Sequence, residues 1–382
     1  MKKHNIILFS MLLLNSSSLL AQLKYELNSN VGLEQEKKER ILTNHIYSVS
    51  FLEPHVGDIP HYSKLDIISA FPDKKIEEIN FYDGFGDLYQ SRKIKLGANK
   101  EDITIGFSYD DLGRRSKEYL PFPNENTLNY GIRSNYIFTS HLNFLEGEEK
   151  RNNYYLAKFP KEWKEEDIKN PYSERLIEKS PLNRIEKQAM PGKDWGKDQG
   201  NTVDFEYAIN MTSDLVKRYG VYYKDTTGDE MTIVDEGFYG IATLQKTITR
   251  DENHSGTSKN HTTETFKNKQ GQVILKRTYN KDIPHDTYYV YDDFGNLSFV
   301  IPPKVTFPIS DEAMNNLCYQ YKYDSRNRLI EKKLPGKGWE FIVYDNLDRP
   351  VLTQDSNLKQ KQQWLYTKYD VLGRVAYTGV YV

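Results

Sequence analysis

Histidine and acidic side chains are the first residues of this sequence that could bind a metal ion. His254 and His261 flank a polar segment, and His55 and His61 lie close together further upstream. A zinc site needs more ligands than these and hydrogen bonds that orient them, and neither a His-Glu-x-x-His motif nor a cysteine pair is present. The acidic segment 225–230 lacks the alternating oxygen ligands and the distal glutamate of a calcium loop. The sequence therefore predicts no metal site, and we interpret these segments as loops and a hairpin turn.

Paired carboxylates and glycine-rich segments are the next candidates, because they could support acid–base catalysis or phosphate binding. Asp110-Asp111 and Asp292-Asp293 are adjacent pairs, but neighbouring residues of a strand point to opposite faces of a sheet. The Gly-Phe-Gly segment 84–86 has no G-x-G-x-x-G pattern and no phosphate-binding loop around it, and no G-x-S-x-G motif occurs. We therefore expect no catalytic residue and no cofactor.

Composition narrows the function classes further. The chain has 382 residues, with 52 Lys and Arg against 54 Asp and Glu and a formal net charge of −2. This balance provides no general basic field, so we expect no nucleic-acid partner. The only cysteine, Cys318, cannot form an internal disulfide and is interpreted as a packed small residue. Tyrosine is unusually frequent, with 29 residues against 17 Phe and 4 Trp, which favours strands and half-buried surfaces.

The first 21 residues have the pattern of a secretory signal peptide. Lys2 and Lys3 precede a short apolar stretch, a serine patch and Ala21, after which we expect cleavage. The apolar stretch is shorter than the roughly 20 residues that a helix needs to cross a bilayer. The sequence thus predicts an exported protein (periplasmic, on the outer surface or secreted) with no transmembrane segment after signal cleavage.

The rest of the chain divides by composition into three parts. Residues 22–45 are polar and highly charged, and we interpret them as a leader or linker. Short strand-like segments with apolar and polar alternation, such as 103–109, predict an N-terminal β domain over residues 46–260. Within it, the Asn-rich and then charged residues 124–170 predict an irregular or helical insertion. Residues 261–382 hold the densest part of an internal repeat.

That repeat is a Tyr-Asp motif with six well-formed copies. Each copy has a Tyr followed by Asp, and three residues after the Asp comes Gly, or Asn or Asp in its place. A degenerate copy begins at Phe266, and successive starts through 291, 323, 344 and 369 lie 25, 32, 21 and 25 residues apart. The residues that define the six copies are Tyr82, Asp83 and Gly86; Tyr109, Asp110 and Gly113; Tyr291, Asp292 and Gly295; Tyr323, Asp324 and Asn327; Tyr344, Asp345 and Asp348; and Tyr369, Asp370 and Gly373.

Each position of the motif has a physical role in a strand–turn–strand hairpin. We expect the Tyr ring to pack on a face while its hydroxyl reaches solvent, and the Asp to accept hydrogen bonds from backbone N–H groups ahead of it. Gly supplies a positive φ, and Asn327 and Asp348 are the next most tolerant residue types. The Arg or Asn that follows is expected to be exposed. Because one isolated hairpin is marginally stable, the copies must stack, so the sequence predicts an all-β fold of repeated antiparallel hairpins.

The six copies resemble the YD-repeat family, also called Rhs repeats, of secreted and surface proteins of bacteria and of teneurins. The block 180–195, together with the copies at 82 and 109, resembles the uncharacterised N-terminal domain of large exported Rhs proteins of Gram-negative bacteria. This resemblance covers roughly residues 45–382 and implies a strand ribbon that spirals into a shell. In large members the shell encloses a C-terminal cargo, often a toxin. Because this chain stops at Val382, just after a repeat, we expect it to be the N-terminal part of a longer system.

Two functions from different classes follow from this reading. The first is a non-enzymatic, exported β-repeat module that forms the start of a shell or a scaffold for other Rhs-system components. The second is an envelope or secreted adhesin that binds a surface glycan, a peptide or a protein through tyrosine-lined repeats. A hydrolase within residues 124–260 has no motif to support it.

Overall fold

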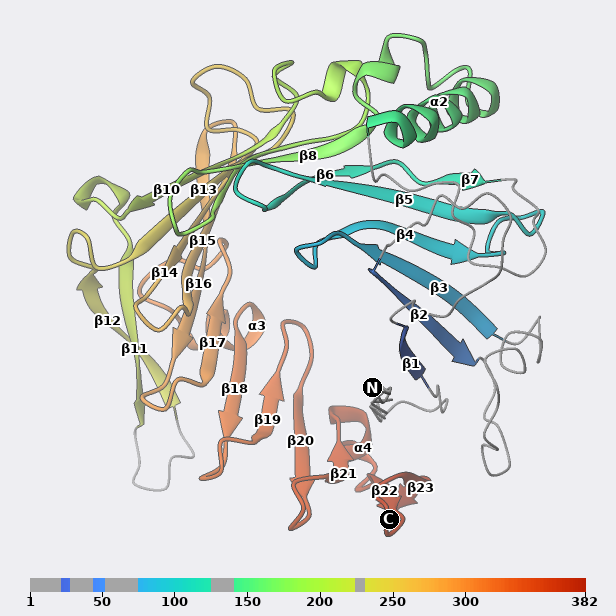
Figure 1. Cartoon of the computed structure of the whole chain (residues 1–382). Helices are drawn as coiled ribbons and strands as arrows, with labels where there is room; N and C mark the ends of the chain where they lie inside the picture. Colours follow the sequence, from blue (N-terminus) through green and yellow to red (C-terminus); the bar gives the residue numbers. More distant parts are fainter. Residues whose placement is uncertain (1–21, 28–43, 52–74, 125–140, 224–230) are drawn as a thin grey trace, which may run out of the picture. The chain divides into compact units, whose positions relative to one another are not determined.

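The computed structural model describes residues 22–27, 44–51, 75–124, 141–223 and 231–382 (Figure 1). The chain forms two compact units, residues 1–202 and residues 203–382. This division differs from the boundary between residues 260 and 261 that the repeat pattern suggests, because strands before residue 260 pair with the repeat strands. The signal peptide expected at 1–21, the acidic segment 225–230, His55 and His61 lie outside the described residues.

Unit 1 is built from antiparallel strands that pair in order from β1 to β5. The ladder branches at β5, which pairs with β7 through its first residues and with β6 through its last; β8 and β9 then follow β6. The strands are β1 (Gln22–Leu27), β2 (Asn44–Phe51), β3 (Lys75–Tyr82), β4 (Leu88–Ile94), β5 (Asp102–Tyr109), β6 (Arg115–Tyr119), β7 (Phe122–Asn124), β8 (Tyr172–Ile177) and β9 (Ile185–Ala189).

Two segments of unit 1 can be compared with what the sequence predicts for them. Strand β1 falls inside the segment 22–45 that we interpret as a leader, and it pairs antiparallel with β2 over its full length. The segment 124–170 contains the helix α2 (His141–Lys158) and the 3-10 turn η1 (Asp167–Lys169). A second 3-10 turn, η2 (Lys193–Trp195), follows β9.

Unit 2 is a longer antiparallel ladder whose strands pair in chain order (Figure 1). Its strands are β10 (Val203–Ile209), β13 (Gln245–Arg250), β14 (Thr262–Lys267), β15 (Val273–Asn280), β16 (Ile283–Tyr291), β17 (Leu297–Ile301), β18 (Tyr319–Tyr323), β19 (Leu329–Lys333), β20 (Trp339–Tyr344), β21 (Pro350–Gln354), β22 (Trp364–Tyr369) and β23 (Val375–Tyr381). The prediction of an all-β fold of antiparallel hairpins is confirmed.

A separate hairpin covers part of this ladder. Its strands, β11 (Lys217–Tyr223) and β12 (Met231–Phe238), pair with each other and form a small second sheet. Tyr219 and Val221 of β11 and Ile233 of β12 pack on a core that includes Phe266, with no measurable exposure, and Val290. Short helical segments complete the unit: η3 (Thr212–Asp214), α3 (Asp311–Asn316) and α4 (Ser356–Gln360). Hydrophobic burial under the hairpin therefore anchors the start of the repeat ladder.

Among the described residues, no helix is long and apolar enough to span a lipid bilayer.

Candidate functional site

The six Tyr-Asp motifs all form the same tight turn between two paired strands. In the copy at Tyr323, the backbone N–H of Asp324 donates to the carbonyl of Arg328 at 3.0 Å, and that of Asn327 donates to the carbonyl of Asp324 at 2.9 Å. The Asp324 carboxylate oxygen Oδ1 accepts from the backbone N–H groups of Arg326 and Arg328, at 2.9 and 3.0 Å. The other five copies repeat these bonds. We call these segments the Tyr-Asp turns.

The fifth residue of each Tyr-Asp turn adopts a left-handed backbone conformation. Its φ lies between 58° at Asn327 and 91° at Gly86, and the pairing of the Tyr with the residue six positions later is shifted by a bulge. A positive φ at this position is what a bulged hairpin turn requires, and Gly, Asn and Asp tolerate it best. The structure therefore places all eighteen residues named for the motif in equivalent turns, and the bonds among them are structural.

Five of the six motif tyrosines connect neighbouring hairpins through their hydroxyls. The hydroxyl of Tyr323 donates to the backbone carbonyl of Leu297, the first residue of the return strand in the preceding copy, at 3.0 Å. Tyr344 makes the same bond to Leu329 at 2.9 Å. The remaining bonds of this kind join Tyr109 to Leu88, Tyr291 to Val273 and Tyr369 to Pro350. Each bond ties one hairpin to the one before it.

The arginines that follow the left-handed residue also act between copies. The Arg328 guanidinium donates through Nε to Asp324 Oδ2 at 2.7 Å and through Nη1 to Asp348 Oδ1, in the next turn, at 2.6 Å. It also lies over the ring of Tyr344, with 4.8 Å between its Cζ and the ring centroid. The expectation of an exposed arginine is wrong here, because only 22% of the Arg328 side chain is exposed; it holds for Arg374, at 65%.

Two further turns have the same geometry with other residues. In the degenerate copy, Asn268 takes the place of Asp, with its Oδ1 accepting from the backbone N–H groups of Gln270 and Gln272. The Tyr position of this copy is Lys267, paired with Val273, so the turn starts one residue later than the sequence alignment at Phe266 suggests. The only residue of this turn that the motif predicts is Gly271, three residues after Asn268. Its φ is 82°.

The second such turn lies in unit 1, between β8 and β9. The backbone N–H of Glu178 donates to the carbonyl of Arg184, Asn183 has a φ of 52°, and the Arg184 guanidinium pairs with the Glu178 carboxylate at 2.8 Å. Arg114 of the neighbouring turn donates to the carbonyl of Glu178 at 2.7 Å and to Asn183 Oδ1 at 2.9 Å. A motif search misses this turn because Glu replaces Asp and the loop is longer; the Asn-Arg dipeptide is its only signal.

Carboxylates of the turns are held in their charged form. The Arg114 guanidinium lowers the pKa of Asp110 below its usual value, and the Arg349 guanidinium does the same for Asp345. Hydrogen bonds from Arg184 and Ser180 lower the pKa of Glu178 to about 2. Because each of these groups is bonded in its ionised form, folding favours the carboxylate over the carboxylic acid.

A second set of charges lies at the start of the unit 2 ladder, on η3 and on the successive strands β13 to β16, and is largely shielded from solvent. Lys246 of β13 pairs with Asp214 at 2.7 Å and with Glu264 of β14 at 3.2 Å, and Glu264 is 1% exposed. Arg277 of β15 pairs with Asp286 of β16 at 2.6 Å. We call these five residues the buried charge cluster. Burial is the largest single effect on the pKa of Asp214 and raises it, but the hydrogen bonds from Lys246 and from the Met211 backbone N–H, together with the charges of Lys246 and Arg277, leave that pKa below the usual value.

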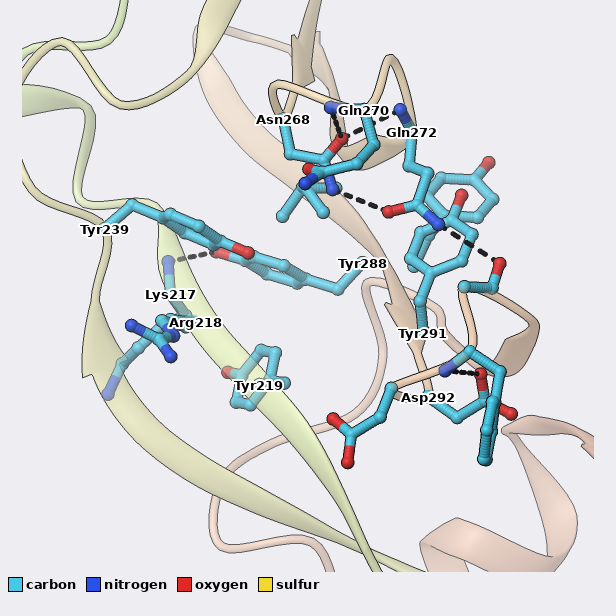
Figure 2. A pocket seen from close by; sticks show the side chains of 15 residues that line it. Lys217, Arg218, Tyr219, Tyr239, Asn268, Gln270, Gln272, Tyr288, Tyr291 and Asp292 are labelled. Atoms are coloured by element: carbon cyan, nitrogen blue, oxygen red, sulfur yellow. Dashed lines mark hydrogen bonds between the residues drawn. The ribbon is translucent and has the colours of Figure 1, made fainter.

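Beside this cluster, the β11–β12 hairpin and two turns enclose a pocket of about 540 Å³ (Figure 2). Such a volume falls within the roughly 300–1,000 Å³ of small-molecule sites. Hairpin residues line one side of the pocket, and the turns 268–272 and 291–295 line the other (Figure 2). The lining is Lys217, Arg218, Tyr219, Tyr239, Asn268, Gln270, Gln272, Ile274, Tyr288, Tyr289, Tyr291, Asp292, Asp293, Phe294 and Gly295.

Five of the fifteen residues that line this pocket are tyrosines. Tyr219 meets Tyr288 edge to face, with 5.1 Å between ring centroids, and stacks on Phe307 at 4.5 Å. The Tyr288 hydroxyl donates to Asp286 Oδ2 at 3.3 Å and accepts the backbone N–H of Lys217 at 3.4 Å, which joins the pocket to the buried charge cluster. Burial and the nearby Asp286 carboxylate raise the pKa of Tyr288 to about 12. The Tyr288 phenol is therefore a neutral hydrogen-bonding group at physiological pH.

Of the residues noted in the sequence, His254 and His261 make hydrogen bonds and Cys318 packs in the core. His254 lies 2.9 Å from the Ser258 carbonyl through Nε2, and the His261 ring lies 3.1 Å from Asp251. Cys318 is fully buried in the core of unit 2. Within the described part of the chain, no group of three His, Cys, Asp or Glu side chains could hold a metal ion.

One segment of the chain matches a known protein family. Residues 61–209 match the family DUF6443, a domain of unknown function. This match falls in the region where the sequence reading places an uncharacterised domain. No curated protein matches the chain.

Among solved structures, similar chains occur in two TcdB2-TccC3 crystal structures and in a Tc holotoxin pore. The crystal structure of TcdB2-TccC3-TEV has 13% sequence identity and a TM-score of 0.47, with 92% of this chain and 14% of that chain covered. The crystal structure of TcdB2-TccC3 has 12% identity and a TM-score of 0.47, with coverage of 97% and 15%. The Photorhabdus luminescens Tc holotoxin pore has 14% identity and a TM-score of 0.46, with coverage of 89% and 13%. The chain thus spans a small part of the structures that it matches.

Proposed function

We propose that this chain is a non-enzymatic β-repeat module of the YD-repeat (Rhs) type, which forms a wall segment of a larger shell or scaffold. The observation that carries the proposal is the chain of bonds between Tyr-Asp turns. Five of the six motif tyrosines donate to a carbonyl of the preceding hairpin, and the side chains of Arg114, Asn296 and Arg328 bond to the next turn. Units that contact only their neighbours build an extended wall.

The resemblance of the six Tyr-Asp copies to Rhs repeats supports a role in an exported assembly of a Gram-negative bacterium, of the kind that encloses a toxin in large Rhs proteins. The match of residues 61–209 to a domain of unknown function is compatible with that role. In this proposal the partners are other components of the same system, and the protein acts after export to the periplasm, the outer surface or the medium.

A localisation and assembly experiment tests this proposal. A tagged copy of the gene at its native locus is followed through cytoplasmic, periplasmic, outer-membrane and medium fractions, and the recovered protein is sequenced from its N-terminus. We expect an exported protein that begins after Ala21 and that migrates in a particle larger than the single chain. A protein retained in the cytoplasm with its first 21 residues, or one that migrates only as a single chain, contradicts the proposal.

The absence of enzymatic activity is tested separately. Generic esterase, glycosidase and peptidase substrates are incubated with the purified protein, and we expect no turnover above a heat-denatured control. Saturable hydrolysis that is lost on unfolding contradicts this part of the proposal and leaves the scaffold role to be judged by the assembly experiment.

A further inference from the structure

The pocket between the β11–β12 hairpin and the turns 268–272 and 291–295 holds polar groups that the bonds between repeats do not use. Two of its lining residues do join the repeats, since Tyr291 donates to the Val273 carbonyl and Gln272 to the Gly295 carbonyl. Its other side is a hairpin that occurs once in the described chain. From its lining we propose that it binds a neutral saccharide, as a mono- or disaccharide unit of a larger glycan.

Hydrogen-bonding groups remain available in the pocket. The Gln270 amide, the Asp293 carboxylate and the Tyr239 hydroxyl line the pocket, and none of them makes a side-chain hydrogen bond or ion pair with another described residue. Together they offer N–H and O–H donors as well as carboxylate, amide and phenol acceptors. A sugar hydroxyl both donates and accepts, so it suits such a mixed set.

Aromatic rings provide the apolar contacts that a sugar site needs beside its hydrogen-bonding groups. Tyr219, Tyr239 and Tyr288 present phenol rings around the pocket (Figure 2). A pyranose ring has one face of C–H groups, which packs on an aromatic ring while the hydroxyls at its edge bond to polar side chains. Burial raises the pKa of Tyr239, so its hydroxyl keeps its proton and serves as a donor.

The charges of the lining argue against an anionic ligand. The two cations, Lys217 and Arg218, are already paired with the carboxylates of Asp235 and Glu236 at 2.8 and 2.7 Å. Asp292 and Asp293 add two carboxylates to the lining. A phosphate or sulfate would therefore meet more negative charge than free positive charge, and Coulomb repulsion would disfavour it. A neutral, hydroxyl-rich ligand meets no such repulsion.

This inference does not rest on the proposed scaffold function, because loss of sugar binding would leave the bonds between Tyr-Asp turns intact.

Titration of the full chain with defined sugars tests the inference. Maltose, lactose, cellobiose and N,N′-diacetylchitobiose are titrated by isothermal calorimetry, alongside a sulfated heparin disaccharide and tetralysine. We expect at least one neutral disaccharide to bind saturably, with an affinity that changes little between low and moderate salt. Binding of the sulfated sugar or of tetralysine alone, or of no neutral sugar by the folded protein, overturns the inference.

Variants with a matched control assign the binding to this pocket. Asp293→Ala and Gln270→Ala each remove one free hydrogen-bonding group, and we expect about tenfold weaker binding in each case. Asp111→Ala removes an aspartate at the same turn position in unit 1, outside the pocket, and should bind as the parent does. Circular dichroism checks that every variant is folded. Unchanged affinity in both pocket variants places the sugar elsewhere and overturns the assignment.

Discussion

The Tyr-Asp turns and the buried charge cluster both pair carboxylates with cations, but they do so in different surroundings. At the turns, the Asp carboxylate first satisfies backbone N–H groups and then pairs with a partly exposed arginine, as at Asp324 and Arg328. In the cluster, Glu264 is 1% exposed and depends on Lys246 and Lys259 for its counter-charge. The charges of the Tyr-Asp turns therefore stabilise the same local conformation in each copy. The charges of the buried charge cluster occur once and interact strongly with one another.

The largest difference between the two regions should appear when a counter-charge is removed from the cluster. Lys246→Ala leaves the Glu264 and Asp214 carboxylates without their shared partner, and we expect the free energy of unfolding to fall by about 3–5 kcal/mol. Arg250→Ala on the same strand is the matched control, since its pair with Glu206 is more exposed and should contribute about 0–1 kcal/mol. Urea denaturation of both variants measures the two values. Equal losses would show that the cluster behaves as surface charge.

Acid should destabilise many Tyr-Asp turns at once, because it protonates their carboxylates. Asp110, Asp345 and Asp370 have pKa values below the usual one because of bonds to Arg114, Arg349 and Arg374 respectively. Their stabilisation is complete above the unfolded-state pKa of about 3.9 and is lost as pH falls through the lower folded-state values. We expect the urea midpoint to decline below about pH 4.

The decline should be smaller in an Asp345→Asn variant, because one titrating group has been removed. A pH profile of this variant that is identical to the parent's would mean that the Asp345 carboxylate makes no measurable contribution to the acid effect, contrary to its lowered pKa.

A single turn can be broken by removing its Asp side chain. Asp324→Ala removes the acceptor for two backbone N–H groups and the partner of Arg328, and we expect a loss of about 1–3 kcal/mol. Asp324→Asn keeps an oxygen for the backbone and should lose clearly less, since Asn268 already fills this position in the degenerate turn. Urea denaturation compares the two; an Asn variant as unstable as the Ala variant would place the main contribution in the ion pair.

The Tyr-Asp turns could be predicted from the sequence because their conformation depends on residues that are close together in the chain. An Asp that bonds to the N–H groups just ahead of it and a Gly three residues later leave a pattern within four positions, as at 83–86. The all-β fold follows from the repetition of that pattern. The turn at Glu178 escaped detection because a longer side chain and a longer loop reach the same geometry by different spacing.

The buried charge cluster and the pocket could not be predicted in this way. Asp214, Lys246 and Arg277 meet only after η3 and strands β13 to β15 have come together. None of these residues has a distinctive neighbour in the sequence that marks it as buried. Contacts that join residues 30 or more positions apart depend on the register of the sheet, which single-residue patterns do not encode.

The bond between neighbouring hairpins should contribute less than the turn itself. Tyr323→Phe keeps the ring but removes the hydroxyl that donates to the Leu297 carbonyl, and we expect a loss of about 0.5–1.5 kcal/mol. Tyr321→Phe on the same strand is the control, because its hydroxyl makes no hydrogen bond with another described residue. Urea denaturation of the two variants tests whether the phenol bond stabilises the ladder; equal values would leave only ring packing as the role of the motif tyrosine.

The smallest effect is expected at the last turn, where the arginine pairs only within its own copy. Arg374 bonds to Asp370 and is 65% exposed, whereas Arg328 also reaches the Asp345 carbonyl, Asp348 and the Tyr344 ring. We expect Arg374→Ala to cost less than about 0.5 kcal/mol, as for an exposed ion pair, and Arg328→Ala to cost more than about 1 kcal/mol. If the two losses are equal, the arginine acts within its own turn and only the tyrosine connects one hairpin to the next.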